Sequence, residues 1–120
     1  MIAHIFNYFG VEMDPMTTEV DDTIAAQVAA LFGALGDTSR VRIISVLVQG
    51  EVNVGDLAER VDLSQSAVSH HLRTLRQLRL VQARKDGRHV YYRLDDDHVR
   101  DLFVRGLEHV RHQTDVRHQA

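Results

Sequence analysis

Apolar residues recur every three or four positions along most of the 120-residue chain, which is the period of helices with one buried face. The pattern predicts five helices, over residues 23–35, 39–49, 53–63, 64–80 and from about 95–97 to 113. The third and fourth helices are separated by only a brief break. These two short helices are therefore expected to form one helix-turn-helix unit.

The third and fourth helices each have a clear apolar stripe. In the third helix, Leu57, Ala58 and Val61 are expected to face inward. Ser64 is the expected N-cap of the fourth helix. The inward stripe of the fourth helix is predicted to consist of Val68, Leu72, Leu75 and Leu78.

The pattern changes to strands in the stretch VQARKDGRHVYYRL, residues 81–94. Two β-prone runs flank the pair Asp86-Gly87, which is the strongest short-range signal for a hairpin. Four helices, a hairpin and a last helix are the order of a winged helix-turn-helix. The predicted fold class is therefore mainly α with a β-hairpin wing.

The organisation along the chain predicts one folded domain. Residues 1–19 have no clear period and are expected to form a flexible extension, residues 20–113 the winged helix-turn-helix domain, and residues 114–120 a frayed C-terminal tail. No apolar run approaches the ~20 residues that a membrane span needs, and the N-terminus lacks the basic start of a secretory signal. We therefore expect a cytoplasmic protein with no membrane partner.

Charge is distributed unevenly, although the net charge is only −3. Residues 1–39 carry six acids and no Lys or Arg, residues 40–93 carry ten Lys or Arg against five acids, and residues 94–120 carry four against six. A basic middle between acidic ends is typical of a nucleic-acid face built from one segment of a fold. A solvated charged surface is the alternative if charge is considered alone.

The predicted recognition helix and wing carry the candidate DNA contacts. The second helix of a helix-turn-helix enters the major groove with its N-terminus first, so its early exposed residues contact bases and phosphates. Cations at a hairpin tip can contact phosphates or a minor groove. The candidates are Gln65, Ser66, Ser69, His70 and Arg73 on the helix and Arg84, Lys85 and Arg88 on the wing.

Three motifs in the sequence are similar to those of a known family: LGDTSRVRII, DLAERVDLSQSAVSHHLRTLRQLRLV and GRHVYYRL. In this order, over about residues 24–112, the sequence resembles the ArsR/SmtB family of small metal-responsive repressors. The resemblance implies a homodimer that binds operator DNA without metal, dissociates when metal binds, and thereby derepresses metal efflux or resistance genes. It also implies a dimer interface made by the first and last helices, which agrees with the apolar stripes at 24–35 and 99–110.

The last predicted helix carries the candidate metal ligands Asp96, His98, His109 and His112. His98 and His109 are eleven residues apart, only about 20° from the same helical face but about 16 Å apart along the axis. One helix cannot close such a site, because imidazoles bind zinc at about 2 Å. Two antiparallel copies of the helix would form two equivalent sites across a dimer axis. The family's last-helix sensor pattern matches the same four residues.

The identity of the metal is a separate question. A carboxylate with three imidazoles suits tetrahedral Zn²⁺ or Co²⁺, whereas Ni²⁺ prefers more ligands, for which His118 and His4 are extra candidates. The sequence contains no cysteine, and Asn53 and Gly55 stand where the family's thiolate sensors carry a cysteine pair. This argues against arsenic, cadmium and lead.

Two other functions are alternatives to a metal-responsive repressor. A winged-helix repressor could respond to a signal other than a metal, with its histidines serving only as surface residues. A zinc hydrolase would need an open coordination position and a nearby general base. Four protein ligands in a helix seam offer neither, and no nucleophile motif is present. We therefore do not expect an enzyme.

Overall fold

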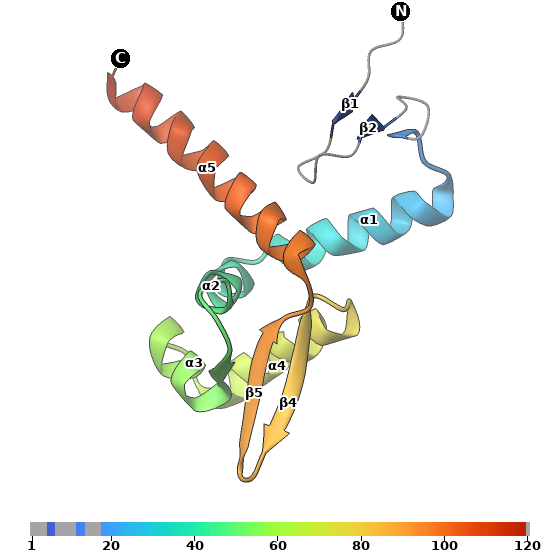
Figure 1. The fold of residues 1–120 in the computed structure, drawn as a ribbon. Helices are drawn as coiled ribbons and strands as arrows, with labels where there is room; N and C mark the ends of the chain where they lie inside the picture. The colour runs from blue at the N-terminus through green and yellow to red at the C-terminus, as the bar shows by residue number, and fades with distance from the viewer. Residues whose placement is uncertain (1–4, 7–11, 14–17, 120) are drawn as a thin grey trace, which may run out of the picture. The chain divides into compact units, whose positions relative to one another are not determined.

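The computed structural model describes residues 5–6, 12–13 and 18–119. The chain divides into two compact units, Met1–Gly33 and Ala34–Ala120. Within the first unit, strands β1 (Ile5–Phe6) and β2 (Glu12–Met13) pair antiparallel, a pairing that the sequence pattern did not predict. Helix α1 (Asp22–Leu35) follows (Figure 1), and its last two residues lie past the boundary between the units.

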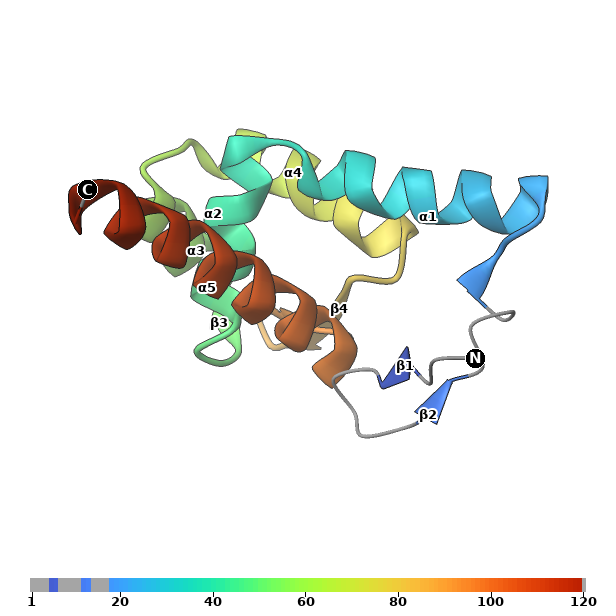
Figure 2. The same cartoon turned by 90° about the horizontal axis from the view of Figure 1, so that it is seen from above.

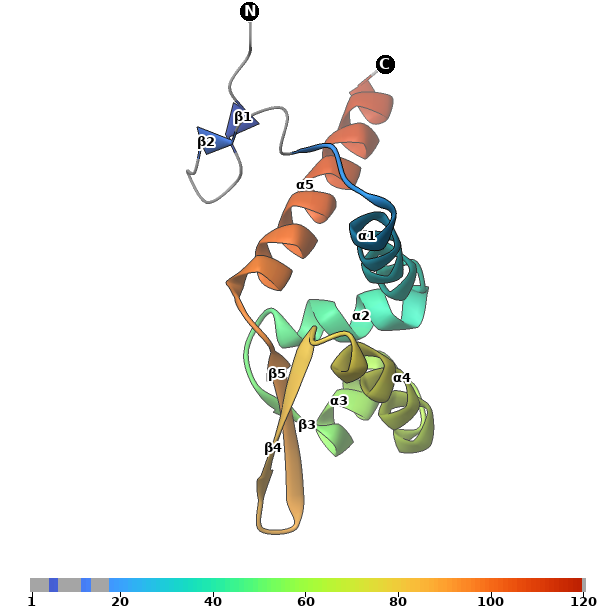
Figure 3. The same cartoon turned by 90° about the vertical axis from the view of Figure 1, so that its right-hand side faces the viewer.

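The second unit contains the predicted helix-turn-helix, hairpin and last helix. Its elements are α2 (Thr38–Leu47), β3 (Val52–Asn53), α3 (Val54–Val61), α4 (Gln65–Gln77), β4 (Val81–Asp86), β5 (His89–Leu94) and α5 (Asp97–Gln119). The fold class predicted from the sequence, mainly α with a β-hairpin wing, is confirmed. The hairpin of β4 and β5 projects beyond α2, α3 and α4, as Figures 1 and 3 both show.

The wing is a three-stranded sheet rather than the two-stranded ribbon expected from the sequence. The strand order is β3-β5-β4, and all pairs are antiparallel. Asp86 pairs with His89, so the hairpin loop consists of Gly87 and Arg88, one residue later than expected. Gly87 has φ +61°, and a glycine with positive φ at the first loop position is typical of a type II′ turn.

The hydrophobic core lies between α2, α3, α4 and the start of β4. Its most deeply buried side chains are Ile43, Ile44, Leu57, Val68, Leu72, Leu75 and Val81. The predicted inward faces of α3 and α4 are confirmed, with one exception. Leu78 is 38% exposed because α4 ends at Gln77 and Leu78 forms its C-cap.

Side-chain caps define the starts of the helices in this unit. Asp37 accepts a hydrogen bond from the Arg40 amide at the start of α2, and Ser64 accepts one from the Ala67 amide at the start of α4. The latter confirms the cap predicted from the sequence. Such caps satisfy backbone donors that have no partner inside the helix.

Helix α5 is one continuous helix (Figure 2). It extends to Gln119, six residues past the expected end at Gln113, and it includes most of the stretch expected to be a frayed tail. None of the helices in the described part of the chain is long and apolar enough to cross a membrane.

Replacement of the α4 cap tests how strongly this local interaction stabilises the fold. Ser64→Ala is expected to lower the free energy of unfolding by about 1 kcal/mol, because the Ala67 amide loses its partner. Ser66→Ala makes the same chemical change on an exposed residue two positions later and is the control. Chemical denaturation of both variants measures the difference, and equal losses would contradict the capping role.

Candidate DNA interface and metal site

The turn between α3 and α4 is short and well defined. Asp62 caps the C-terminus of α3 in the left-handed region, with φ 57° and ψ 49°. The Leu63 amide donates to the Ala58 carbonyl over 3.0 Å, and Ser64 then caps α4. Only three residues therefore separate the two helices, which gives the tight turn that a helix-turn-helix requires.

The packing of α4 fixes which of its residues face solvent. Val68, Leu72 and Leu75 have no exposed surface and anchor one side of the helix. The other side carries all five candidate contacts predicted from the sequence, and each is exposed: Gln65, Ser66, Ser69, His70 and Arg73. The structure therefore presents them on the solvent side of one helix, beginning at its N-terminus.

The candidate cations of the wing have different environments. Lys85 and Arg88 are exposed near the hairpin loop. Arg84 instead binds Glu51 through two hydrogen bonds, from Nη2 to Oε1 over 2.5 Å and from Nε to Oε2 over 3.3 Å. Its guanidinium also lies over the Tyr91 ring, 4.9 Å from the ring centre. No pattern in the sequence indicates this pairing.

The first two candidate metal ligands lie together at the start of α5. Asp96 Oδ1 accepts a hydrogen bond from the Val99 amide, so this residue caps the helix. Its Oδ2 lies 3.4 Å from His98 Nδ1, and both side chains are exposed. Burial raises the pKa of the Asp96 carboxyl, but hydrogen bonds from Val99 and His98 outweigh it, and the pKa lies below its ordinary value. Asp96 is therefore ionised at neutral pH.

The other two candidates, His109 and His112, are exposed farther along the same helix. Among the residues that the structure describes, no group of three or more acids and histidines in one chain could hold a metal ion. The 3.6-residue repeat places His98 and His109 about 16 Å apart along the axis. Four-ligand binding by this set would therefore need a second chain.

The two extra candidates have a different status. His4 lies outside the described residues, and the side chain of His118 is also outside the described part. The helix does extend to position 118.

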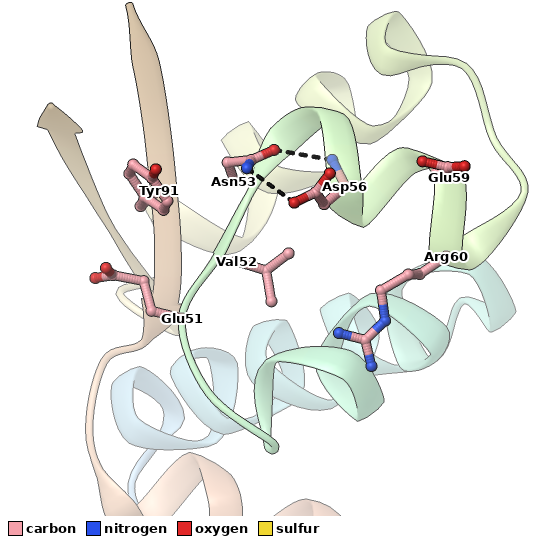
Figure 4. Close-up of a pocket in the computed structure, with 7 residues that line it drawn as sticks. All are labelled: Glu51, Val52, Asn53, Asp56, Glu59, Arg60 and Tyr91. Atoms are coloured by element: carbon pink, nitrogen blue, oxygen red, sulfur yellow. Dashed lines mark hydrogen bonds between the residues drawn. The ribbon is translucent and has the colours of Figure 1, made fainter. Parts of the chain in front are cut away.

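The positions that would carry cysteines in thiolate sensors lie at the start of α3 here. Asn53 caps α3, with its Oδ1 accepting from the Asp56 amide over 2.9 Å and its Nδ2 donating to Asp56 Oδ2 over 3.0 Å (Figure 4). Gly55 lies close to the Gln65 side chain, because an added Cβ would be 3.6 Å from Gln65 Nε2. No soft ligand is available at this place.

Comparison with known proteins supports the DNA-binding interpretation. Residues 37–83 match the family described as bacterial regulatory protein, arsR family. The chain is 44% identical over 100 residues to the transcriptional repressor SmtB homolog of Synechocystis sp., an alignment that covers 83% of this chain and 74% of that protein. It is 45% identical over 85 residues to the cadmium resistance transcriptional regulatory protein CadC homolog of Staphylococcus aureus, covering 70% of each.

Solved structures agree with the sequence comparisons. The homodimeric winged helix-turn-helix DNA-binding domain from Mycobacterium bovis superposes with a TM-score of 0.70 at 29% identity, covering 78% of this chain and 89% of that domain. A tight helix-turn-helix with a polar exposed helix and a hairpin wing is the architecture of DNA-binding transcriptional regulators. The chain belongs to the ArsR/SmtB family of these regulators.

The exposed start of α4 leads to a test of base recognition. Gln65→Ala is expected to weaken binding to duplex DNA from upstream of its own gene at least about tenfold, since one good base contact contributes roughly 1–3 kcal/mol. Binding to a scrambled duplex of the same length should change little. Gln77→Ala, at the opposite end of α4, is the matched control. A loss that is equal on both duplexes would contradict base recognition by Gln65 and indicate a phosphate contact.

Proposed function

We propose that this protein is a metal-sensing repressor. In this proposal, a metal-free homodimer binds operator DNA in the cytoplasm and dissociates when Zn²⁺, or else Co²⁺ or Ni²⁺, binds. Genes for metal efflux or resistance are then derepressed. The observation that carries the proposal is the exposed Asp96–His98 pair on the helix that also bears His109 and His112.

The donor groups fit a divalent transition metal. The Asp96 carboxylate is ionised, and its Oδ2 lies 3.4 Å from the nearest ring nitrogen of His98. The pair is solvent-exposed, so an ion can reach it without opening the core. Carboxylate and imidazole ligands suit Zn²⁺ and Co²⁺, and without cysteine the set is unsuited to softer thiolate-binding metals.

The missing ligands would come from a second copy of the chain. In an antiparallel pair of α5 helices, Asp96 and His98 of one protomer meet His109 and His112 of its partner. An isologous dimer then has two equivalent sites. The homodimeric state of the similar Mycobacterium bovis domain supports this arrangement.

Exposed apolar side chains provide independent support for a dimer. When large apolar side chains are exposed along one stripe of a helix in a single chain, that face is typical of an interface with another molecule. On α1 and two residues before its start they lie four apart and are Val20, Ile24, Val28 and Phe32, between 41% and 56% exposed. On α5, Val110 is 58% exposed. These are the two helices that the resemblance assigns to the dimer interface.

Release of DNA follows from linkage between two binding sites. A bound ion would supply one new constraint, a cross-link between the last helices of the two protomers. The two α4 helices must fit two half-sites one helical turn apart, so their spacing determines affinity. Any constraint that favours another spacing weakens DNA binding, and DNA then weakens metal binding by the same factor.

Loss of one ligand should separate metal sensing from DNA binding. His98→Asn is expected to bind upstream DNA as the wild type does but to need at least roughly tenfold more Zn²⁺ for release. His89→Asn, on an exposed wing histidine, is the control and should release DNA at the wild-type Zn²⁺ concentration. Fluorescence anisotropy of labelled DNA measures both.

Two outcomes of this experiment would contradict the proposal. If neither Zn²⁺, Co²⁺ nor Ni²⁺ releases DNA from the wild type, the regulator responds to a signal other than a metal. If His98→Asn and His89→Asn release DNA equally well, His98 is not a ligand. Better release by Ni²⁺ than by Zn²⁺ would instead add histidines such as His4 to the set.

A further inference from the structure

Arg84 forms an ion pair with Glu51, which lies 33 residues earlier in the sequence. Its Nη2 and Nε bond the two carboxylate oxygens of Glu51, which is the forked geometry of a bidentate arginine–carboxylate pair. The hydrogen bond from Arg84 lowers the pKa of Glu51, and the same bond raises the pKa of Arg84. Each group therefore stabilises the charged form of the other.

Two further groups surround the same guanidinium. Tyr91 is the cross-strand partner of Arg84, and its ring lies under the guanidinium carbon. The Asp86 carboxylate lies 3.6 Å from Nη1. Two carboxylates and one aromatic face thus orient this half-exposed cation and compete with a phosphate for its donors.

The position of Glu51 determines which segments of the chain the Glu51–Arg84 ion pair connects. Glu51 directly precedes β3, whose residue Asn53 caps α3, the first helix of the helix-turn-helix. In Figure 4, Glu51 and Tyr91 lie together at one side of a pocket whose other side is formed by α3 residues. The Glu51–Arg84 pair therefore ties β4 of the wing to the segment that leads into α3.

The remaining wing cations differ from Arg84. Within the described residues, neither Lys85 nor Arg88 forms an ion pair, and both are exposed. They lie at and beside the hairpin loop. Their charges are available for phosphates, and the charge of Arg84 is largely satisfied by the protein.

We propose that Arg84 and Glu51 are positioning residues that set the wing against the helix-turn-helix, while Lys85 and Arg88 contact the DNA backbone. This proposal rests on the wing reaching DNA. It replaces the expectation from sequence that Arg84 itself is a DNA contact. Its distinctive consequence is that an acid, Glu51, promotes binding to a polyanion.

The first test asks whether removal of the Glu51 charge strengthens or weakens DNA binding. Removal of a negative charge near DNA normally strengthens binding. Glu51→Gln is expected instead to weaken binding of the metal-free protein to upstream DNA about three- to tenfold, because the wing loses its tether. Glu59→Gln makes the same change on an exposed acid lining the same pocket, and it should leave binding unchanged or slightly stronger. Circular dichroism and thermal unfolding check that both variants are folded.

The second test uses the salt dependence of DNA binding. Each lost phosphate contact lowers the slope of log K against log salt by about one, and by about two in a two-fold dimer. Lys85→Ala and Arg88→Ala should show this decrease. Arg84→Ala should weaken binding with the slope unchanged, and the Glu51→Gln/Arg84→Ala double variant should bind within about twofold of Arg84→Ala alone.

Two results would overturn the proposal. Stronger binding by Glu51→Gln, together with a lower slope for Arg84→Ala, would make Arg84 an ordinary phosphate contact. Unchanged slopes for Lys85→Ala and Arg88→Ala would show that the wing does not reach the backbone. All measurements use the metal-free protein, so neither result depends on whether metal releases DNA.

Discussion

Burial of Val68, Leu72 and Leu75 fixes the rotation of α4 about its axis, and the DNA-binding account depends on that rotation. All three side chains are inaccessible to solvent. A turn of the helix by one residue, about 100°, would move Ser69 and Arg73 toward the core. A buried cation without a partner costs far more than a domain of this size can tolerate. The apolar stripe thus also determines which polar residues face the solvent.

A second constraint comes from the length of α5. A helix rises about 1.5 Å per residue, so ligands eleven residues apart cannot share one ion. The proposed ligand set of Asp96, His98, His109 and His112 therefore requires two copies of the helix side by side. Metal binding and the spacing of the two α4 helices then depend on the same dimer geometry. In the proposed mechanism, this shared geometry is how a site on the last helix influences DNA held elsewhere.

The elements predicted from the sequence are those with strong local signals. α3 and α4 have regular apolar spacing, a Ser64 cap and a short turn, and the hairpin has its Asp86-Gly87 signal. β1, β2 and β3 are only two residues long, too short for any periodicity, and could not be predicted. One feature of the sequence does indicate that α5 continues past Gln113: the stretch after this residue contains neither Gly nor Pro.

The candidate site also has some features that the sequence predicts and others that it does not. Asp96 as a cap near His98 follows from sequence spacing, and so does the exposed face of α4. The Glu51–Arg84 pair does not, because residues 33 positions apart meet only through the β3-β5-β4 sheet. A run of cations in a sequence does not distinguish a charge that the protein has neutralised from one that is available to DNA. Contacts of this kind depend on the tertiary fold.

The central claim, a metal site shared between protomers, can be tested by mixing two inactive variants. One chain carries Asp96→Asn and His98→Asn, and the other carries His109→Asn and His112→Asn. A mixed dimer keeps one complete site only if each site takes ligands from both chains. The account predicts that neither variant alone gives tetrahedral Co²⁺ absorption, and that refolding the two together restores it at one ion per mixed dimer. No recovery in a mixture verified to contain mixed dimers would contradict the shared site.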